Sequence, residues 1–159
     1  MVGVSPLPGH HVIPPSWSEH HRPTAESSMT STCVIRQRPP ATGWNPQDGT
    51  TGGEDGPVVY DGPCRVQAQA TQAREAEAAG QDVSAVLYLV ALPADAATIH
   101  AGRSAGDIVE VTANPDDPNL VGRRLAVIDV GHGSVLWQRN LTCRDDLTAN
   151  QPPRDLQGA

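Results

Sequence analysis

The stretch "RRLAVIDVGHGSVLWQRNLTC" (residues 123–143) decides the fold. Apolar and polar residues alternate on both sides of its central Gly-His-Gly. Alternation with period two is typical of a half-buried strand, and two such runs joined by glycines predict an antiparallel hairpin. Gly131 and Gly133 would provide the conformations of a tight turn, and His132 would point outward from its tip.

The same pattern recurs along the rest of the chain. In "TCVIRQR", Cys33 and Ile35 fall on one face and Val34 and Arg36 on the other. The predicted strands outside the hairpin cover 32–38, 58–70 with a turn or bulge at Asp61-Gly62-Pro63, 83–92 and 108–113. About six short strands without β-α-β alternation predict a mainly β fold, a small antiparallel barrel or sandwich.

The N-terminal region has a different composition. "PLPGHHVIPP" is too rich in proline for a helix or strand and predicts an extended arm. Ser16 and Glu19 then have the spacing of a capping box and predict a short helix, which Pro23 would end or kink within two turns. We therefore divide the chain into an arm and short helix (1–28), a barrel domain (29–145) and a polar C-terminal tail (146–159).

Two polar segments predict long connections. Residues 39–57 form a loop rich in Gly and Pro, and residues 71–82 predict a short surface helix or a mobile loop. Trp44 is an apolar side chain in the first of these loops, which suggests that the loop docks on another surface. Trp137, in a predicted strand, would fill the core or a seam between subunits.

Composition restricts the class of protein. The 159 residues are enough for one domain, and the net charge of −7 with no basic patch argues against a nucleic-acid-binding surface. An acidic surface would repel DNA and would suit a wall past which DNA slides. Nothing resembles a signal peptide or a membrane span, which predicts a soluble protein made in a cytoplasm. Three separated cysteines predict free thiols acting as small buried hydrophobes.

Several motifs invite a chemical interpretation. Asp129 and His132 are three residues apart and could act as a general base or metal site, with Cys143 as a further member. No nucleophile elbow accompanies them, and Asp107 and Asp129 fall on the polar face of predicted strands, so a hairpin tip is the better interpretation. The pairs His10-His11 and His20-His21 predict solvated or interface histidines. We expect no catalytic residue, no bound metal and no cofactor.

Five stretches taken together carry a resemblance. They are "HHRPTAESSMTSTCVIR" (20–36), "GWNP" (43–46), "VVYDGPCRVQ" (58–67), "YLVALPADA" (88–96) and the run from 105 to 143. In this order and spacing they resemble the small head-to-tail connector proteins of tailed phages, of the head-closure or stopper type, found in phages and prophages of actinobacteria.

The resemblance implies a virion protein assembled in the bacterial cytoplasm. Such a protein is a β-barrel that forms a ring of six or twelve copies, below the portal and adaptor and above a tail terminator or tail tube. The ring seals the DNA-filled capsid and later forms part of the channel through which double-stranded DNA leaves without sequence-specific binding. Neither catalysis nor a membrane is implied.

The resemblance and the composition together suggest two sets of residues for this role. Candidate interface or docking residues are Trp17, His20, His21, Arg22, Trp44 and His132. A candidate gate facing the channel consists of Arg74, Glu75, Glu77 and Asp82. The alternatives are another connector component (an adaptor or tail-completion protein), a small metal-binding or hydrolytic barrel using Asp129 and His132, and a module that binds peptides at an edge strand.

Overall fold

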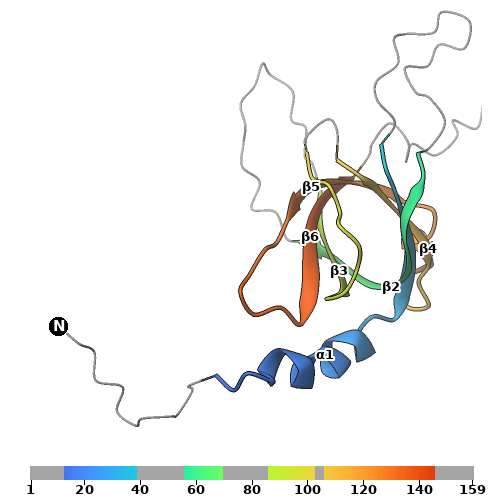
Figure 1. Ribbon diagram of the computed structural model, residues 1–159. Coiled ribbons are helices and arrows are strands. Elements are labelled where there is room, and N and C mark those ends of the chain that lie inside the picture. The colour runs from blue at the N-terminus through green and yellow to red at the C-terminus, as the bar shows by residue number, and fades with distance from the viewer. Residues whose placement is uncertain (1–12, 39–55, 70–85, 103–105, 146–159) are drawn as a thin grey trace, which may run out of the picture.

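The computed structural model describes residues 13–38, 56–69, 86–102 and 106–145. Its elements are α1 (Trp17–Ser27), β1 (Ser31–Arg36), β2 (Val58–Gln69), β3 (Leu87–Pro93), β4 (Ile108–Ala113), a 3-10 turn (Pro118–Leu120), β5 (Arg124–Val130) and β6 (Gln138–Asp145). The six strands form a closed antiparallel barrel in the order β1-β2-β3-β6-β5-β4, and α1 lies at one end of it (Figure 1). The predicted mainly β barrel with one short N-terminal helix is confirmed.

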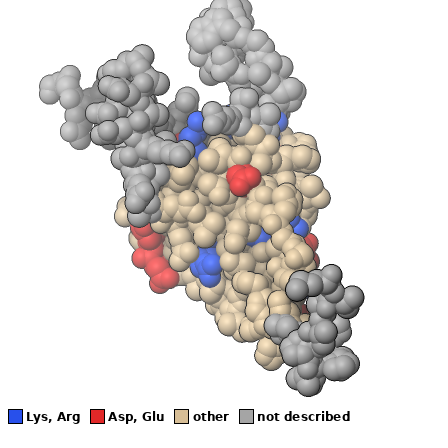
Figure 2. All heavy atoms as spheres, turned by 90° about the vertical axis from the view of Figure 1, so that its left-hand side faces the viewer, with Lys and Arg blue, Asp and Glu red and all other residues tan. Residues whose placement is uncertain are grey.

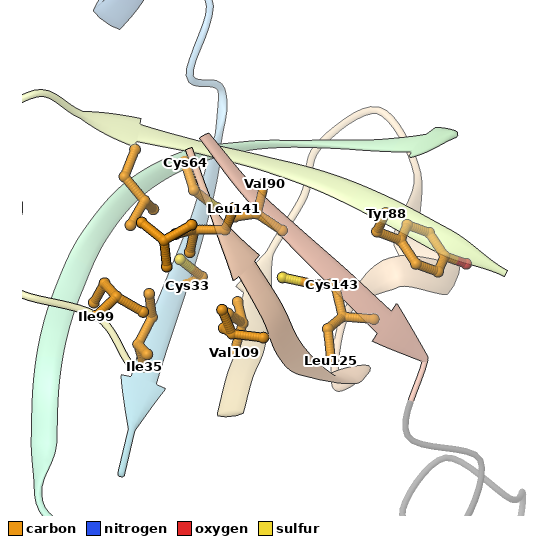
Figure 3. Packing of buried hydrophobic residues seen from close by; sticks show 13 residues of the cluster. Cys33, Ile35, Cys64, Tyr88, Val90, Ile99, Val109, Leu125, Leu141 and Cys143 are labelled. Atoms are coloured by element: carbon orange, nitrogen blue, oxygen red, sulfur yellow. The ribbon is translucent and has the colours of Figure 1, made fainter. Parts of the chain in front are cut away.

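The barrel interior is filled by the alternating apolar residues of the strands. In β1, Cys33 and Ile35 are fully buried whereas Val34 and Arg36 are partly exposed, as their alternation predicts. Side chains from all six strands meet in this core, as Figure 3 shows. Cys33, Cys64 and Cys143 are free and buried within it, which confirms their prediction as small hydrophobes.

Strand β2 spans nearly the predicted range and runs without a break through Asp61-Gly62-Pro63. The predicted turn or bulge there is wrong, because Gly62 pairs with Cys33 and Pro63 with Thr32 in a regular ladder. The Tyr60 hydroxyl folds over Gly62 and donates to the Pro63 carbonyl at 2.6 Å. The first half of β2 pairs with β1 up to Cys64, and from Arg65 the strand pairs with β3 instead.

The β5–β6 hairpin exists, but its turn is not tight. Residues 131–137 separate the two strands, and the Gly131 N–H donates to the Asn140 carbonyl at 2.8 Å. Neither Gly131 nor Gly133 has a positive φ; within the described residues that conformation belongs to Gly122, with φ 82°. The predicted turn conformations of the two glycines are therefore wrong. Gly131 instead allows close approach, since a Cβ there would lie 3.3 Å from the Asn140 carbonyl oxygen.

Two features of helix α1 differ from those predicted, the cap at Ser16 and the end at Pro23. Ser16 is the residue before the first turn but makes no side-chain capping bond, and Pro23 lies inside a helix that continues to Ser27. Pro23 therefore does not end the helix, and the other predicted effect, a kink, stays a prediction. A proline removes one backbone hydrogen bond, here to the carbonyl of Glu19, and because Glu19 is exposed water can take that place. Of the helices in the described ranges, none combines the length and apolar character needed to cross a membrane.

The connection between β3 and β4 folds back onto β5. Ile99 is buried in the core, and the Gly102 N–H donates to the Val127 carbonyl at 3.1 Å. Asp107 is buried, and its carboxylate accepts the backbone N–H of His100 at 2.9 Å. The expected exposure of Asp107 is wrong for this reason, whereas Asp129 is exposed as predicted.

Candidate functional site

The end of the barrel that carries α1 holds the most distinctive surface of the described residues. The Trp17 ring packs edge to face against Trp137, with centroids 4.8 Å apart and planes at 75°. At the other end of the helix, Arg65 Nη1 donates to Ser28 Oγ at 2.8 Å. No residue of α1 is buried. The helix therefore rests on the barrel surface through a few contacts and contributes nothing to the core.

Trp137 does not fill the core, and in that respect its prediction is wrong. It lies just before β6, in the loop 131–137, and its exposed fraction is 37%. The inward positions of β6 are occupied by Leu141 and Cys143, which are fully buried. Because Trp137 precedes the paired residues of β6, strand alternation does not direct its side chain into the barrel. The indole ring packs against Trp17 of α1 instead.

The predicted interface residues of α1 divide into two groups. His21 stacks on Trp17 with ring centroids 4.2 Å apart and lies 5.4 Å from the His20 ring. His20 and Arg22 are exposed. The structure thus joins Trp17 and His21 to Trp137 in one aromatic cluster, which we call the Trp17 cluster, and leaves His20 and Arg22 pointing to solvent.

A groove of about 550 Å³ runs between α1 and the barrel beside the Trp17 cluster. Arg65 lies in it, because its guanidinium reaches Ser28 on one side and Gln138 Oε1 at 3.4 Å on the other. Arg65 was not among the predicted site residues, because a single arginine in a strand gives no signal that could have identified it. Its two bonds link α1 to the start of β6.

His132 is exposed, as predicted, on the loop 131–137. It borders a separate hollow of about 190 Å³, whose wall also includes Trp137 and Gln138. Trp44 and the predicted gate residues Arg74, Glu75, Glu77 and Asp82 lie outside the described residues, so their roles stay predictions.

The structure does not bring Asp129, His132 and Cys143 into one site. Asp129 and His132 are exposed, whereas Cys143 is fully buried inside the barrel, where burial raises the pKa of its thiol to about 12. The pKa of Cys33 is also raised, chiefly by its hydrogen bond to Cys64 and then by burial. Within the described part of the chain, no three His, Cys, Asp or Glu side chains are grouped to hold a metal ion.

Charge is scattered over the visible surface. On the face shown in Figure 2, Arg, Asp and Glu side chains lie singly or in small groups within a larger uncharged area. A part-buried ion pair, Arg123 Nη1 to Asp145 Oδ2 at 2.6 Å, belongs to the end of β6 and not to the α1 surface. The α1 end of the barrel is therefore defined by aromatic and apolar contacts more than by charge.

Three comparisons relate the chain to known proteins. Residues 21–144 match the model described as "Family of unknown function (DUF6093)". No curated protein matches the sequence. The solution structure of protein SF1141 from Shigella flexneri 2a is 15% identical and covers 75% of this chain and 94% of its own, with a TM-score of 0.37. A TM-score of this size supports no conclusion about fold or function.

Proposed function

This chain belongs to the DUF6093 family, whose function is unknown, and we propose that it is a ring subunit of a phage head-to-tail connector, of the stopper type. In this proposal six or twelve copies form a ring below the portal and adaptor and above the tail terminator or tail tube. The ring seals the filled capsid and later lets double-stranded DNA pass without reading its sequence. The subunit is a structural virion protein without catalytic residues or cofactor.

The observation that carries the proposal is the exposed position of α1. An isolated helix of 11 residues is marginal in water, since its nucleation is unfavourable and it has few backbone bonds. Here the helix has no buried residue and contains a proline, and its own barrel holds it chiefly at its two ends, through Trp137 and Arg65. A neighbouring subunit that covers the free face of α1 would supply the rest.

Exposed apolar side chains support the same conclusion. Ile13 lies just before α1 in the chain and Trp137 contacts α1 from the barrel. Their exposed fractions are 54% and 37%. Val58 pairs with Arg36 at the end of β1 remote from α1, and is itself exposed. A cyclic ring joins two different patches of each subunit, so apolar groups at opposite ends of one barrel suit head-to-tail contact around a ring.

The sequence resemblance supplies the biological setting of the proposal. The five stretches that resemble stopper proteins include most of α1, all of β1 and β5, and β6 as far as Cys143. The alternative with an active site at Asp129 and His132 has no comparable support, because the third member of that set, Cys143, points into the core. Other connector components remain the nearest competing proposal.

The test is the assembly state of the full chain. Native mass spectrometry and electron microscopy of the purified protein should show a closed ring of defined copy number, alone or on a purified portal and adaptor complex. Ile13→Ser should weaken assembly, whereas Val121→Ser should not, although Val121 is also exposed, at 45% in the β4–β5 turn. A chain that stays monomeric at high concentration and does not bind the connector complex would refute the proposal.

A further inference from the structure

One stretch of β2 has a free edge among the described residues. Strand β1 begins at Ser31, opposite Cys64, and from Arg65 to Gln69 strand β2 pairs with β3 alone. Successive residues of a strand direct their N–H and C=O groups to opposite sides. About half of the backbone groups in this stretch therefore point away from β3, towards the position that β1 would occupy if it were longer.

A groove of about 540 Å³ lies along this edge. Its β2 wall consists of Arg65, Val66, Gln67 and Ala68, and the loop after β4 forms the opposite wall. Five residues of extended chain span about 17 Å, so a short strand laid beside Arg65–Gln69 would match the whole free edge. The groove thus has the shape and the hydrogen-bonding groups needed for addition of one further strand.

The side chains of the groove define the chemistry of its occupant. Tyr88 is nearly buried and Leu120 packs against the core, so the groove offers apolar contacts. Asp116 and Asp117 are exposed on the loop, whose shape is held because Asn114 Oδ1 accepts the N–H of both at 3.0 and 3.1 Å. The groove therefore favours an extended segment with apolar side chains and without acidic ones.

We propose that residues 4–9 of a second copy of this chain, "VSPLPG", add to β2 along this edge. The inference deepens the proposed function and rests on it in one respect, since it requires copies to assemble. Residues 1–12 contain no Asp or Glu and carry His10 and His11, which suits a groove bordered by two aspartates.

The two prolines of this segment are placed in the way that such a strand requires. Pro6 and Pro8 are two residues apart, so the N–H groups that they lack fall on one side of an extended chain. Ser5, Leu7 and Gly9 direct their N–H and C=O groups to the other side. The segment can pair with β2 through these three residues, and its prolines then block the outer edge against any further strand.

A second copy is a more direct source of this segment than the same chain. The groove includes Ser28, at the C-terminal end of α1, whereas residues 1–12 join the chain at the N-terminal end of the helix. The 11 residues of α1 put these two ends about 16 Å apart. The segment of the same chain would have to double back along α1, but a neighbour in a ring can present its own segment directly.

The experiment places a photo-crosslinking amino acid at Gln67, an exposed position on the groove wall, in the full chain mixed with an isotope-labelled full chain. Mass spectrometry should find crosslinks from Gln67 to residues 1–12 that join one light and one heavy copy. The same probe at Val58, on the half of β2 that pairs with β1, should not give them. Crosslinks within one copy, or to other segments, would overturn the inference.

Two substitutions test the pairing itself. Leu7→Pro removes an N–H that faces β2 and should lower the yield of the Gln67 crosslink about tenfold, whereas Pro8→Ala adds an N–H on the outer side and should leave it unchanged. Equal effects of the two variants would overturn the proposed register.

The inference and the proposed function can fail separately. Rings that form without the Gln67 crosslink would overturn the inference and leave the ring proposal intact. A synthetic peptide of residues 1–12 that crosslinks to Gln67 in a chain that never forms rings would refute the ring proposal while supporting the groove.

Discussion

The contact between Trp17 and Trp137 should hold α1 on the barrel, and Trp137→Ala should release it. An edge-to-face aromatic pair contributes about 0.5–1.5 kcal/mol beyond the burial of its surface. Roughly three-fifths of Trp137 is covered, so burial adds up to about 3 kcal/mol at ~25 cal/mol per Å² for a side chain of this size. This is an upper limit, because the unfolded chain also covers part of its apolar surface.

The expected result is local and not global. Without Trp137, α1 loses its ring contact with the barrel and keeps the Ser28–Arg65 bond, so its amides should lose protection from hydrogen exchange. The amides of β3 and β6, whose residues Val90 and Leu141 are fully buried, should keep theirs. Exchange of each segment is measured by mass spectrometry in the wild type and the variant.

A double-mutant cycle isolates the pair. The free energies of unfolding of Trp17→Ala, Trp137→Ala and the double variant should give a coupling of about 0.5–1.5 kcal/mol. Additive effects, or loss of protection in β6 with α1 unchanged, would refute the view that this contact attaches the helix.

Three other predictions concern the barrel. Leu141→Ala should lower the free energy of unfolding, measured in urea, by about 2–5 kcal/mol, because the side chain is fully buried. Val135 is exposed, so Val135→Ala should change the same quantity by less than about 0.5 kcal/mol. Similar losses in the two variants would contradict the packing described. Asp107→Ala should cost about 1–3 kcal/mol in the same assay, since it removes the buried carboxylate that accepts the His100 N–H, and no loss would argue against that bond. Burial raises the pKa of Cys143 from 9.0 to about 12. As the pH rises, the unfolded chain therefore releases the thiol proton at a lower pH than the folded chain. The free energy of unfolding should stay level below pH 9 and fall by up to about 1.4 kcal/mol per pH unit above it. Cys143→Ala should reduce that slope in urea unfolding at pH 8, 9.5 and 10.5, and an unchanged slope would contradict the assignment.

Alternation along the chain was sufficient to predict the strands whose two faces differ. Cys33 and Ile35 alternate with partly exposed residues in β1, the run before the Gly-His-Gly contains β5, and the run after it contains β6 from Gln138 onward. Such patterns are local, because each residue carries the same preference for core or solvent wherever its strand is paired.

Features that depend on a partner far away in the sequence could not be predicted in this way. Pro63 suggested a break, but β2 tolerates it where the strand passes from β1 to β3. Trp137 was expected in the core or in a seam between subunits, and its place against Trp17 depends on a helix more than a hundred residues earlier in the chain. The candidate site at the α1 end shares this property, which is why Arg65 gave no signal in the sequence.

The change of partner within β2 also limits how the chain can vary in length during evolution. Because side chains alternate between two faces, inserting or deleting one residue between Cys64 and Val66 would turn half of β2 inside out relative to one of its two neighbours. Gains and losses of residues before Val58 or after Gln69 cause no such inversion. Members of the family should therefore differ in length on either side of β2 and keep the number of residues between Gly62 and Val66 constant.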